Sequence, residues 1–437
     1  AGASSESPSA AARAKGASDL ECLKHIELCS WFSRIDSNGN KKEICRDVRE
    51  ICLINIQEWI LSYWFDGADS VQALSSDEAV ELEELVAMVA RWANLPQRPP
   101  GDRKDAALPP WLGKNEKLKC FRLRNDPFPA VYRPLMSYAF TAFAAPAMGN
   151  QALFDLGFRP YRSGSTEYWV RPADPSDTWV RNMGACRPHR IESGRPLVVC
   201  HGIGVGPTMC LPFLQRLTRG LGKDYPIFLV DSAAVSMRFS DDVPGAREVA
   251  SNVSDMLEVW GFKQAHFVGH SFGTFVLVWM LRYQRSYVER TTFLDPVCFL
   301  LLKVLVEAHE LQQVKYGLRM DAMEMAIKYF VLTELFVCNF MCRCFFWEES
   351  HLDMQDLEGM QALLVLESED AIVPTHSVQR LVLAEQHRRA RGKKMQLDDT
   401  GLNVFWVDGQ PHAGFLMDAE ATWAVVDRLQ EFHRAHL

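Results

Sequence analysis

Several short motifs that mark common chemistries are missing from this chain. It has no glycine-rich phosphate loop, no dinucleotide-binding fingerprint and no helix with metal-ligand spacing. None of its twelve cysteines forms a Cys-x-x-Cys pair, and Cys342 and Cys344 are too close together for an ordinary disulfide. These absences predict a function that needs no metal ion and no cofactor.

Negative charges outnumber positive ones, with 55 Asp and Glu against 47 Lys and Arg. The formal net charge is −8, which argues against nucleic acid or an anionic membrane surface as the main partner. Cysteines such as Cys200 and Cys298 lie in apolar runs, where cysteine usually acts as a small buried hydrophobe. The chain opens without a secretory signal. We therefore expect an intracellular, cytoplasmic protein, and the sequence leaves its oligomeric state open.

The length of 437 residues exceeds a single average domain. Residues 1–18 are rich in Ala and Ser, lack an apolar core and predict a disordered tail. Residues 19–130 predict a helical N-terminal region, interrupted near 96–110 by a linker rich in proline and charge. Residues 131–437 predict the main domain.

Within the N-terminal region, apolar residues between Glu21 and Phe65 recur at helical spacing. The segment Asp36 to Asn40 interrupts them, and we interpret it as a helix–turn–helix connection, since its glycine is misplaced for a calcium loop. Ser75 and Glu78 form a capping box that predicts a helix from there to about Trp92.

An uncharged run from Leu135 to Phe154 has the length that spans a bilayer. Pro146 and Gly149 interrupt it, so we predict a helix packed on the main domain. A contact with a membrane, either in its plane or across it, is the alternative.

The most informative stretch is Gly269 to Gly273, with the sequence Gly-His-Ser-Phe-Gly. It follows the apolar run Ala265 to Val268 and precedes the apolar segment Thr274 to Trp279, which predicts a strand, a sharp turn and a helix. Glycines permit such a tight turn because a β-carbon would not fit there. The turn holds the hydroxyl of Ser271 at the tip of a strand, in front of the N–H groups of a helix. This arrangement is typical of a nucleophilic serine.

A nucleophilic serine needs a base, and the base needs an acid that orients it. After such a turn, the acid and then the histidine are expected on loops that follow later strands. Asp370 follows the apolar run Ala362 to Leu366, and His412 follows the run Leu402 to Val407. The sequence therefore contains both partners in the expected order.

A glycine-rich loop lies upstream of these motifs. The strand-like run Pro196 to Cys200 ends in His201 to Gly206, which can turn a backbone N–H toward the serine. Further strand-like runs are Thr166–Val170, Pro226–Val230 and Thr291–Leu294, and helices are predicted over Ala246–Trp260 and Ala421–Phe432. Apolar strands that alternate with helices predict a parallel sheet covered on both faces.

Together these motifs resemble the α/β-hydrolase family, in its lipase- and esterase-like branch with a His-Gly oxyanion loop. The resemblance extends from about Tyr168 to the C-terminus. It implies an α/β fold with a mostly parallel sheet covered by helices on both faces. It also implies a helical cap over the serine, inserted before the acid strand at about residues 297–360. The helical N-terminal region is then an extension of this fold.

The resemblance implies Ser271 as the nucleophile, His412 as the general base and Asp370 as the acid that orients it. The N–H groups of Ile203 and Phe272 would form the oxyanion hole. Glu367 and Glu369 share the turn of Asp370, and Asp295, at the end of an earlier strand, is the main alternative acid.

These roles predict a serine hydrolase that cleaves a carboxylic ester, lipid-like or another acyl ester, through an acyl-enzyme. A thioesterase or an acyltransferase could use the same triad. A ligand receptor or scaffold without turnover is the alternative outside the enzymes. The expected partner is a small-molecule or lipid ester, with no nucleic acid and with a peripheral membrane contact as an open alternative.

Overall fold

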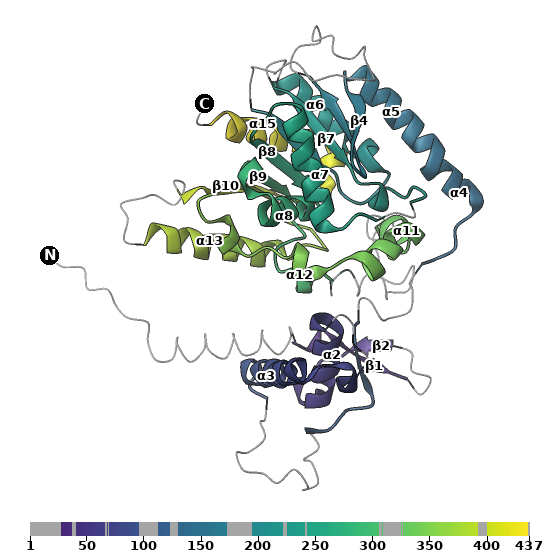
Figure 1. The fold of residues 1–437 in the computed structure, drawn as a ribbon, viewed down its shortest axis with the longest axis vertical. Helices are drawn as coiled ribbons and strands as arrows, with labels where there is room; N and C mark the ends of the chain where they lie inside the picture. Colours follow the sequence, from purple (N-terminus) through teal and green to yellow (C-terminus); the bar gives the residue numbers. More distant parts are fainter. Residues whose placement is uncertain are drawn as a thin grey trace, which may run out of the picture. The chain divides into compact units, whose positions relative to one another are not determined.

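The computed structural model describes residues 28–36, 41–65, 68, 70–95, 112–122, 130–172, 195–221, 225–240, 243–305, 308, 325, 327–391 and 400–435. The chain divides into two compact units, Ala1–Pro127 and Phe128–Leu437 (Figure 1). The predicted tail at 1–18 and the predicted linker at 96–110 lie outside the described residues. The ten cysteines among the described residues are all free thiols.

The first unit combines a small sheet with two helices. Its strands are antiparallel and lie in the order β2-β1-β3, with bounds β1 Phe32–Ile35, β2 Lys41–Ile44 and β3 Leu118–Cys120. The helices are η1 Val48–Glu50, α2 Leu53–Trp64, η2 Val71–Ala73 and α3 Ser76–Trp92. Trp31, Trp59 and Tyr63 form an aromatic core, with ring centroids of Trp31 and Trp59 5.2 Å apart. The capping box of Ser75 and Glu78 is present, so the prediction of the helix to Trp92 is confirmed.

The prediction of helix from Glu21 to Phe65 is wrong for its central part. Phe32–Ile35 and Lys41–Ile44 pair as antiparallel strands, so the interpretation of 36–40 as a helix–turn–helix connection is also wrong. Only Leu53–Trp64 forms a long helix there. The physical reason is tertiary: the third strand of this sheet comes from residue 118 onward, a distant pairing that local periodicity does not contain.

The second unit is built on a sheet of eight strands in the order β11-β10-β9-β8-β6-β7-β5-β4. Only β4 and β5 run antiparallel to their neighbours. The bounds are β4 Arg159–Ser163, β5 Thr166–Arg171, β6 Leu197–Cys200, β7 Ile227–Asp231, β8 Ala265–His270, β9 Val288–Leu294, β10 Gln361–Glu367 and β11 Leu402–Val407. Every predicted strand of this unit is confirmed. The edge strand β4 was not predicted, because its polar sequence with Pro160 carries no apolar alternation.

Helices cover both faces of this sheet (Figure 1). Helices α6 and α15 pack against each other, and α7 and α8 pack against each other on the opposite face. The helices outside the cap and outside the N-terminal helix of this unit are η6 Gly206–Cys210, α6 Leu211–Leu221, η7 Ala233–Val235, α7 Ala246–Val259, α8 Gly273–Tyr283, η8 Arg285–Tyr287, α13 Thr375–Ala390, α14 Gly414–Met417 and α15 Ala419–Arg434. The predicted helices at 246–260 and 421–432 are therefore confirmed.

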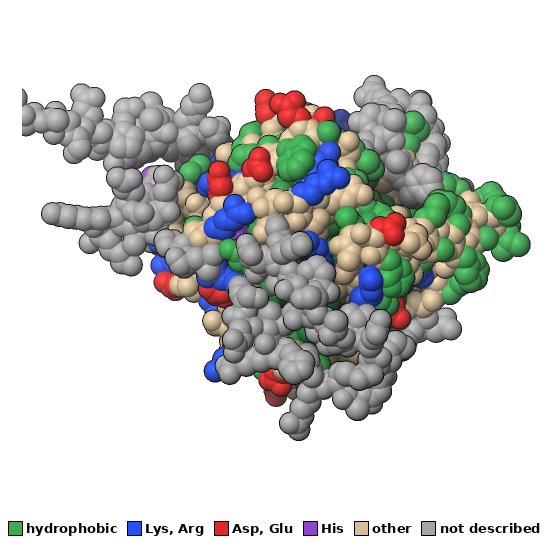
Figure 2. Space-filling model, turned by 90° about the horizontal axis from the view of Figure 1, so that it is seen from above, with side chains coloured by type: hydrophobic (Ala, Val, Ile, Leu, Met, Phe, Trp, Pro, Cys, Tyr) green, Lys and Arg blue, Asp and Glu red, His purple; other side chains and the backbone are tan. Residues whose placement is uncertain are grey.

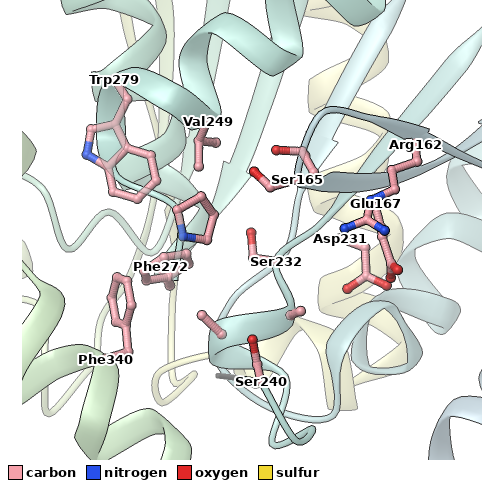
Figure 3. Close-up of a pocket in the computed structure, with 14 residues that line it drawn as sticks. Arg162, Ser165, Glu167, Asp231, Ser232, Ser240, Val249, Phe272, Trp279 and Phe340 are labelled. Carbon is pink, nitrogen blue, oxygen red and sulfur yellow. The ribbon is translucent and has the colours of Figure 1, made fainter. Parts of the chain in front are cut away.

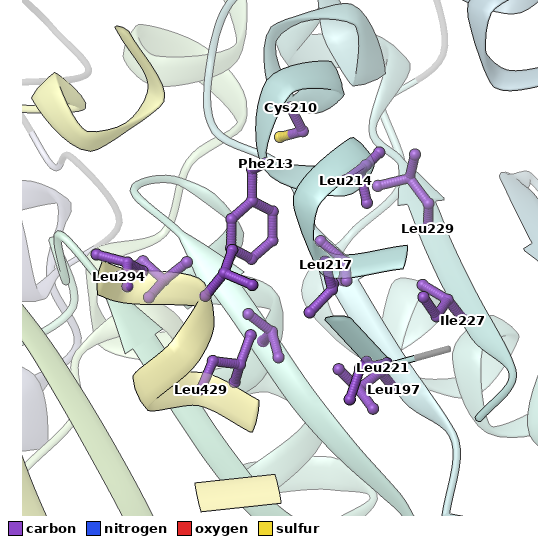
Figure 4. Close-up of a cluster of buried hydrophobic side chains, with 14 of the residues drawn as sticks. Leu197, Cys210, Phe213, Leu214, Leu217, Leu221, Ile227, Leu229, Leu294 and Leu429 are labelled. Atoms are coloured by element: carbon purple, nitrogen blue, oxygen red, sulfur yellow. The ribbon is translucent and has the colours of Figure 1, made fainter. Parts of the chain in front are cut away.

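The core lies between the sheet and the pair α6 and α15. Figure 4 shows Phe213, Leu214 and Leu217 of α6 and Leu429 of α15 facing apolar strand residues such as Leu229. All five side chains are at most 1 % exposed. Burial of this kind contributes about 25 cal/mol per Å² of apolar surface, which fixes the sheet and its strand ends as a rigid base.

The uncharged run before the sheet forms one helical stretch, made of α4 Leu135–Ala139, the π-helical segment η4 Phe140–Ala144 and α5 Ala145–Asp155. It packs on the rest of the second unit through Ala145, Gly149 and Leu153, which are buried. A β-carbon at Gly149 would lie 2.1 Å from Thr208 Oγ1, so the packing there is close. The prediction of a packed helix is confirmed. Among the described residues, none of the helices has the length and apolar character needed to cross a membrane.

The described part of the insertion between β9 and β10 is mostly helical, with turns and irregular residues between its helices. It contains helical turns at 301–305 and the elements η9 Ile327–Leu332, α11 Leu335–Asn339, η10 Phe340–Cys344, α12 Trp347–Ser350 and η11 Met354–Leu357. The ring of Phe340 lies 5.2 Å from the ring of Phe272, directly after the candidate serine. The helical cap predicted at about 297–360 therefore reaches the turn that carries Ser271.

Candidate active site

The turn between β8 and α8 has the geometry of a nucleophile elbow. Ser271 has a positive φ of 50°, a strained conformation for a residue with a side chain. A β-carbon at Gly273 would lie 2.1 Å from the carbonyl oxygen of Cys200, and one at Gly269 would lie 2.6 Å from the carbonyl oxygen of Gly273. Both glycines are thus required because β6, β8 and α8 approach each other too closely for any side chain. The Ser271 N–H donates to Leu294 O at 2.9 Å, which fixes the turn.

The three side chains predicted as a triad meet at this elbow. Ser271 Oγ lies 2.9 Å from His412 Nε2, and His412 Nδ1 lies 2.7 Å from Asp370 Oδ2. The side chains of His412 and Asp370 are almost fully buried, whereas Ser271 remains partly accessible. In the neutral form of His412, Nδ1 donates to the carboxylate and Nε2 accepts from the serine hydroxyl, which is the reactive arrangement.

Asp370 is itself held in place by its own turn. Its Oδ1 accepts hydrogen bonds from the N–H groups of Ile372 and Val373, at 2.7 and 2.8 Å. One carboxylate oxygen therefore anchors the side chain, and the other is left for His412. The Ile-Val-Pro sequence after Asp370, which marked this turn in the sequence, supplies these donors.

Asp295, the alternative acid, does not bond to the His412 ring. Its Oδ2 instead accepts from the N–H of Ala413 at 2.9 Å, next to His412 in the chain. Glu367 accepts from the N–H groups of Gly414 and Phe415, at 3.1 and 2.7 Å. Two buried carboxyl groups thus hold the backbone that follows His412, and Ala413 takes a left-handed φ of 63° there.

Asp295 and Glu367 are both 0 % exposed and are within hydrogen-bonding reach of each other. Burial raises the pKa of Asp295 to about 7 and that of Glu367 to about 9, and the neighbouring carboxyl adds to the rise for Glu367. Two carboxylates this close cannot both be ionised at low cost, so the pair holds a proton at neutral pH. The loop-holding role of Glu367 was missed from sequence, although its place at the end of a buried strand was visible.

The electrostatics around His412 favour its charged form. Burial lowers the pKa of His412, but the Asp370 carboxylate, through charge and hydrogen bond, outweighs burial and raises the pKa to about 9. Asp295 Oδ2 lies 3.5 Å from Nε2 of the neighbouring His270, but burial and the nearby histidines lower the pKa of His270 to about 3. His270 is therefore a neutral packing residue, with its ring 6.1 Å from that of His412.

The glycine-rich loop after β6 lies against the elbow. A β-carbon at Gly202 would be 3.1 Å from Ser271 Cβ, so the backbone that leads to Ile203 passes beside the serine. His201 shapes this loop: its Nδ1 lies 2.7 Å from Gly202 O, and its Nε2 accepts from the Ser232 N–H at 3.1 Å. Phe272 begins α8 as its N-cap residue. Both predicted oxyanion residues therefore lie on backbone adjacent to Ser271.

Asp295, Asp370 and His412 each place one potential metal-ligand atom within 4.8 Å of the others. Their hydrogen bonds already use His412 Nδ1 and Asp295 Oδ2. The arrangement suits a histidine held for proton transfer better than a metal centre, whose ligands need free lone pairs. That no metal takes part stays a prediction.

A cavity of about 140 Å³ lies beside the elbow, with Phe272 in its wall. Figure 3 shows Phe272, Trp279 and Phe340 together at one end of it and Arg162, Glu167 and Asp231 at the other. The cavity is therefore apolar at the end that includes Phe272, the residue after Ser271, and polar at the other end. Phe340 brings the cap to this wall, a contact that the sequence did not reveal.

The strand order of the sheet, the elbow and the order of Ser271, Asp370 and His412 along the chain define the α/β-hydrolase fold. No protein-family model and no curated protein matches the chain. Similar solved structures include the carboxylesterase CesB from Bacillus subtilis, with 14 % identity, a TM-score of 0.41, and 68 % of this chain and 99 % of that chain covered. The naproxen esterase from Bacillus subtilis has 15 % identity and a TM-score of 0.41, with 68 % and 97 % covered. A membrane phospholipase A, described as a bacterial virulence factor, has 13 % identity and a TM-score of 0.41, with 68 % and 94 % covered.

Proposed function

We propose that this protein is a serine hydrolase that cleaves a carboxylic ester through an acyl-enzyme. The observation that carries the proposal is the continuous chain of hydrogen bonds from Ser271 through His412 to Asp370, at 2.9 and 2.7 Å. A serine hydroxyl becomes a strong nucleophile only when a positioned base accepts its proton. The strained elbow and the anchored Asp370 supply that positioning.

The reaction begins when Ser271 Oγ attacks the ester carbonyl and its proton passes to His412 Nε2. The Phe272 and Ile203 N–H groups stabilise the negative charge on the carbonyl oxygen. His412 then gives the proton to the departing alkoxide, and an acyl ester remains on Ser271. Water, deprotonated by His412, hydrolyses this ester and releases the carboxylic acid. Asp370 stabilises the charged His412 in both halves of the reaction.

The apolar end of the cavity supports a substrate with an apolar acyl group. Phe272, Trp279 and Phe340 are all at most 5 % exposed, and they line the end that includes Phe272, the residue after Ser271 in the chain. Each buried methylene of an acyl chain contributes about 0.8 kcal/mol, so such a wall favours alkyl over short polar acyl groups. A lipid-like ester is therefore the substrate class that the site fits best.

The first experiment is labelling of the purified protein with a fluorophosphonate probe, with the modified residue identified by mass spectrometry. We expect modification of Ser271 in the wild type and none in Ser271→Ala. His412→Ala keeps the serine but removes its base, so its labelling rate should fall by orders of magnitude. Ser286→Ala, the same change at an exposed serine of η8, is the matched control and should retain Ser271 labelling.

Labelled protein would then be assayed with p-nitrophenyl esters and thioesters of increasing acyl length. We expect turnover that rises with acyl length and disappears in Ser271→Ala. Folded wild-type protein that neither labels nor turns over any ester would contradict the proposal and favour a ligand receptor. Turnover of thioesters alone would replace the ester by a thioester as the substrate.

A further inference from the structure

Arg133 is a buried cation away from the candidate active site. It directly precedes the helical stretch of α4, η4 and α5, and it is 4 % exposed. Among the described residues, none accepts a hydrogen bond from its Nε, Nη1 or Nη2 atoms. Its guanidinium group lies over the ring of Tyr329, 4.8 Å from the centroid. A buried guanidinium with unused donors is costly unless an anion takes them.

The nearest carboxyl group does not meet that need. Glu334 Oε1 lies 3.8 Å from Arg133 Nη1, too far for a hydrogen bond. Glu334 Oε2 accepts from the Val337 N–H at 2.8 Å, so Glu334 caps helix α11 and is held back from Arg133. Each donor of Arg133 thus lacks a hydrogen-bond partner among the described residues, and Glu334 offsets part of the positive charge.

A cavity of about 250 Å³ opens next to this guanidinium. This volume is far larger than the roughly 15 Å³ that a single water needs. Its lining residues are Arg133, Met136, Ser137, Tyr138, Phe140, Thr141, Met237 and Glu334. Arg133, Glu334 and Met237 are buried, whereas Met136 and Phe140 are exposed, so the cavity runs from a charged floor to an apolar mouth.

The mouth continues onto an apolar surface of the same helical stretch. We name this surface the α4–α5 apolar face, made of Leu135, Met136, Phe140, Phe143 and Met148, each at least half exposed. Figure 2 shows hydrophobic side chains gathered at the right-hand edge of the molecule, where α4 and α5 lie. The sequence from Pro134 to Phe154 carries no charged residue. An apolar chain that leaves the cavity would therefore meet only apolar and uncharged side chains.

We propose that Arg133 and this cavity bind an anionic amphiphile, a molecule with a phosphate or carboxylate head group on an alkyl chain. The head group would take two parallel hydrogen bonds from the guanidinium, the geometry in which arginine binds planar or tetrahedral anions best. The first methylenes would lie between Met136, Phe140 and Met237, and the rest of the chain would follow the α4–α5 apolar face. This site is separate from Ser271 and does not depend on the proposed hydrolase activity.

The test measures binding of decyl phosphate, decanoate, decanol and inorganic phosphate to the full chain by calorimetry, below micelle concentrations. We expect decyl phosphate or decanoate to bind, and both decanol and inorganic phosphate to bind at least tenfold more weakly. The tighter of the two anions identifies the head group as a phosphate or a carboxylate. If inorganic phosphate binds as tightly as decyl phosphate, the alkyl chain is not recognised and the proposal of an amphiphile is wrong. If neither decyl anion binds, the proposal of an anion site at Arg133 is wrong.

Arg133→Met roughly keeps the length of the side chain but removes its hydrogen-bond donors. This substitution should lower the affinity for the decyl anion at least tenfold. Arg159→Met is the matched control, because Arg159 also lies over an aromatic ring, that of Phe154, but outside the cavity. The Arg159→Met variant should bind the decyl anion as tightly as the wild type does.

Ser137→Leu keeps Arg133 and fills the cavity from the helix, so it remains informative even where Arg133→Met does not fold. It should also weaken binding at least tenfold. Unchanged affinity in either folded variant would overturn the proposal, because binding would then occur elsewhere, such as at Ser271.

Discussion

Asp370 and His412 are joined by a hydrogen bond of 2.7 Å, while Asp295 reaches only the backbone next to His412. The two aspartates follow neighbouring strands, β10 and β9, and both approach the same loop. Their contacts differ in kind: Asp370 orients the imidazole ring, and Asp295 holds the chain that carries it. The structure thereby assigns different tasks to two residues that sequence alone left as competitors.

The first prediction separates these two tasks. Asp370→Asn should lower kcat on the order of 10⁴-fold, because the amide no longer stabilises the charged imidazole. Asp295→Asn should stay within about tenfold of the wild type, because its amide oxygen can still accept from Ala413 and its NH₂ can donate to Glu367. Esterase kinetics on both variants check this. Equal losses would mean that Asp295 also acts on the ring.

The second prediction concerns the pH dependence of activity. His412 must be unprotonated to accept the serine proton, and its pKa is raised to about 9. Activity should therefore rise with pH through a midpoint well above 6.5, the ordinary histidine pKa, in the profile of kcat/KM. In Asp370→Asn the negative charge is lost, so the midpoint of the residual activity should move to lower pH. A wild-type midpoint near or below 6.5 would contradict the electrostatic account.

The third prediction concerns the elbow glycines. Gly273→Ala places a β-carbon 2.1 Å from a backbone oxygen, so the two strands and the helix must shift. We expect a loss of about 1–3 kcal/mol in the free energy of unfolding and a large loss of kcat. Gly245→Ala is the control, because nothing lies within 4 Å of its added β-carbon. Gly245 is the N-cap residue of α7, so the free energy of unfolding should fall by about 1 kcal/mol or less and kcat should be unchanged. Chemical denaturation measures both.

The fourth prediction concerns the peripheral membrane contact left open by the sequence. The α4–α5 apolar face offers large side chains to a lipid surface, with Leu135 76 % and Phe143 67 % exposed. Replacing both by Ser removes about 3 kcal/mol or more of transfer free energy. The affinity of the protein for phosphatidylcholine vesicles, measured by co-flotation, should then fall at least about a hundredfold. Met417→Ser changes another exposed apolar residue, in α14, and should float like the wild type. Wild-type protein that stays with the aqueous fraction would refute the contact.

The sheet and the meeting of Ser271, His412 and Asp370 could be predicted because their signals are local. Gly269, Ser271 and Gly273 report a single tight turn, and each buried parallel strand is a short continuous apolar run. The order of these runs along the chain then placed Asp370 and His412 on loops after β10 and β11, and both loops reach Ser271. The two side chains meet because parallel strands bring their carboxyl ends to one edge of the sheet.

The remaining features depend on contacts between distant parts of the chain. Strand β1 is stabilised by pairing with residues 118–120, which lie far away in the sequence. The apolar spacing around β1 does not contain this partner, and taken alone it favours a helix. The tasks of Asp295 and Glu367 depend on which N–H groups reach them, and these come from residues 413–415. The burial of Arg133 likewise depends on the cap segment around Glu334. None of these relations leaves a periodic trace in the sequence.

The buried pair of Asp295 and Glu367 makes folding itself a protonation reaction. In the folded protein the pKa values of Glu367 and His412 are raised to about 9, so both groups keep a proton between pH 7 and 9. In the unfolded chain the same carboxyl group is ionised and the same histidine is neutral in this range. The folded protein therefore binds more protons there than the unfolded chain. The free energy of unfolding must therefore decrease as pH rises through that window. Catalysis needs His412 to lose its proton in the same window. Alkaline conditions that activate this protein are thus also those that weaken its fold, and thermal melts taken beside rate measurements would show the two curves moving in opposite directions.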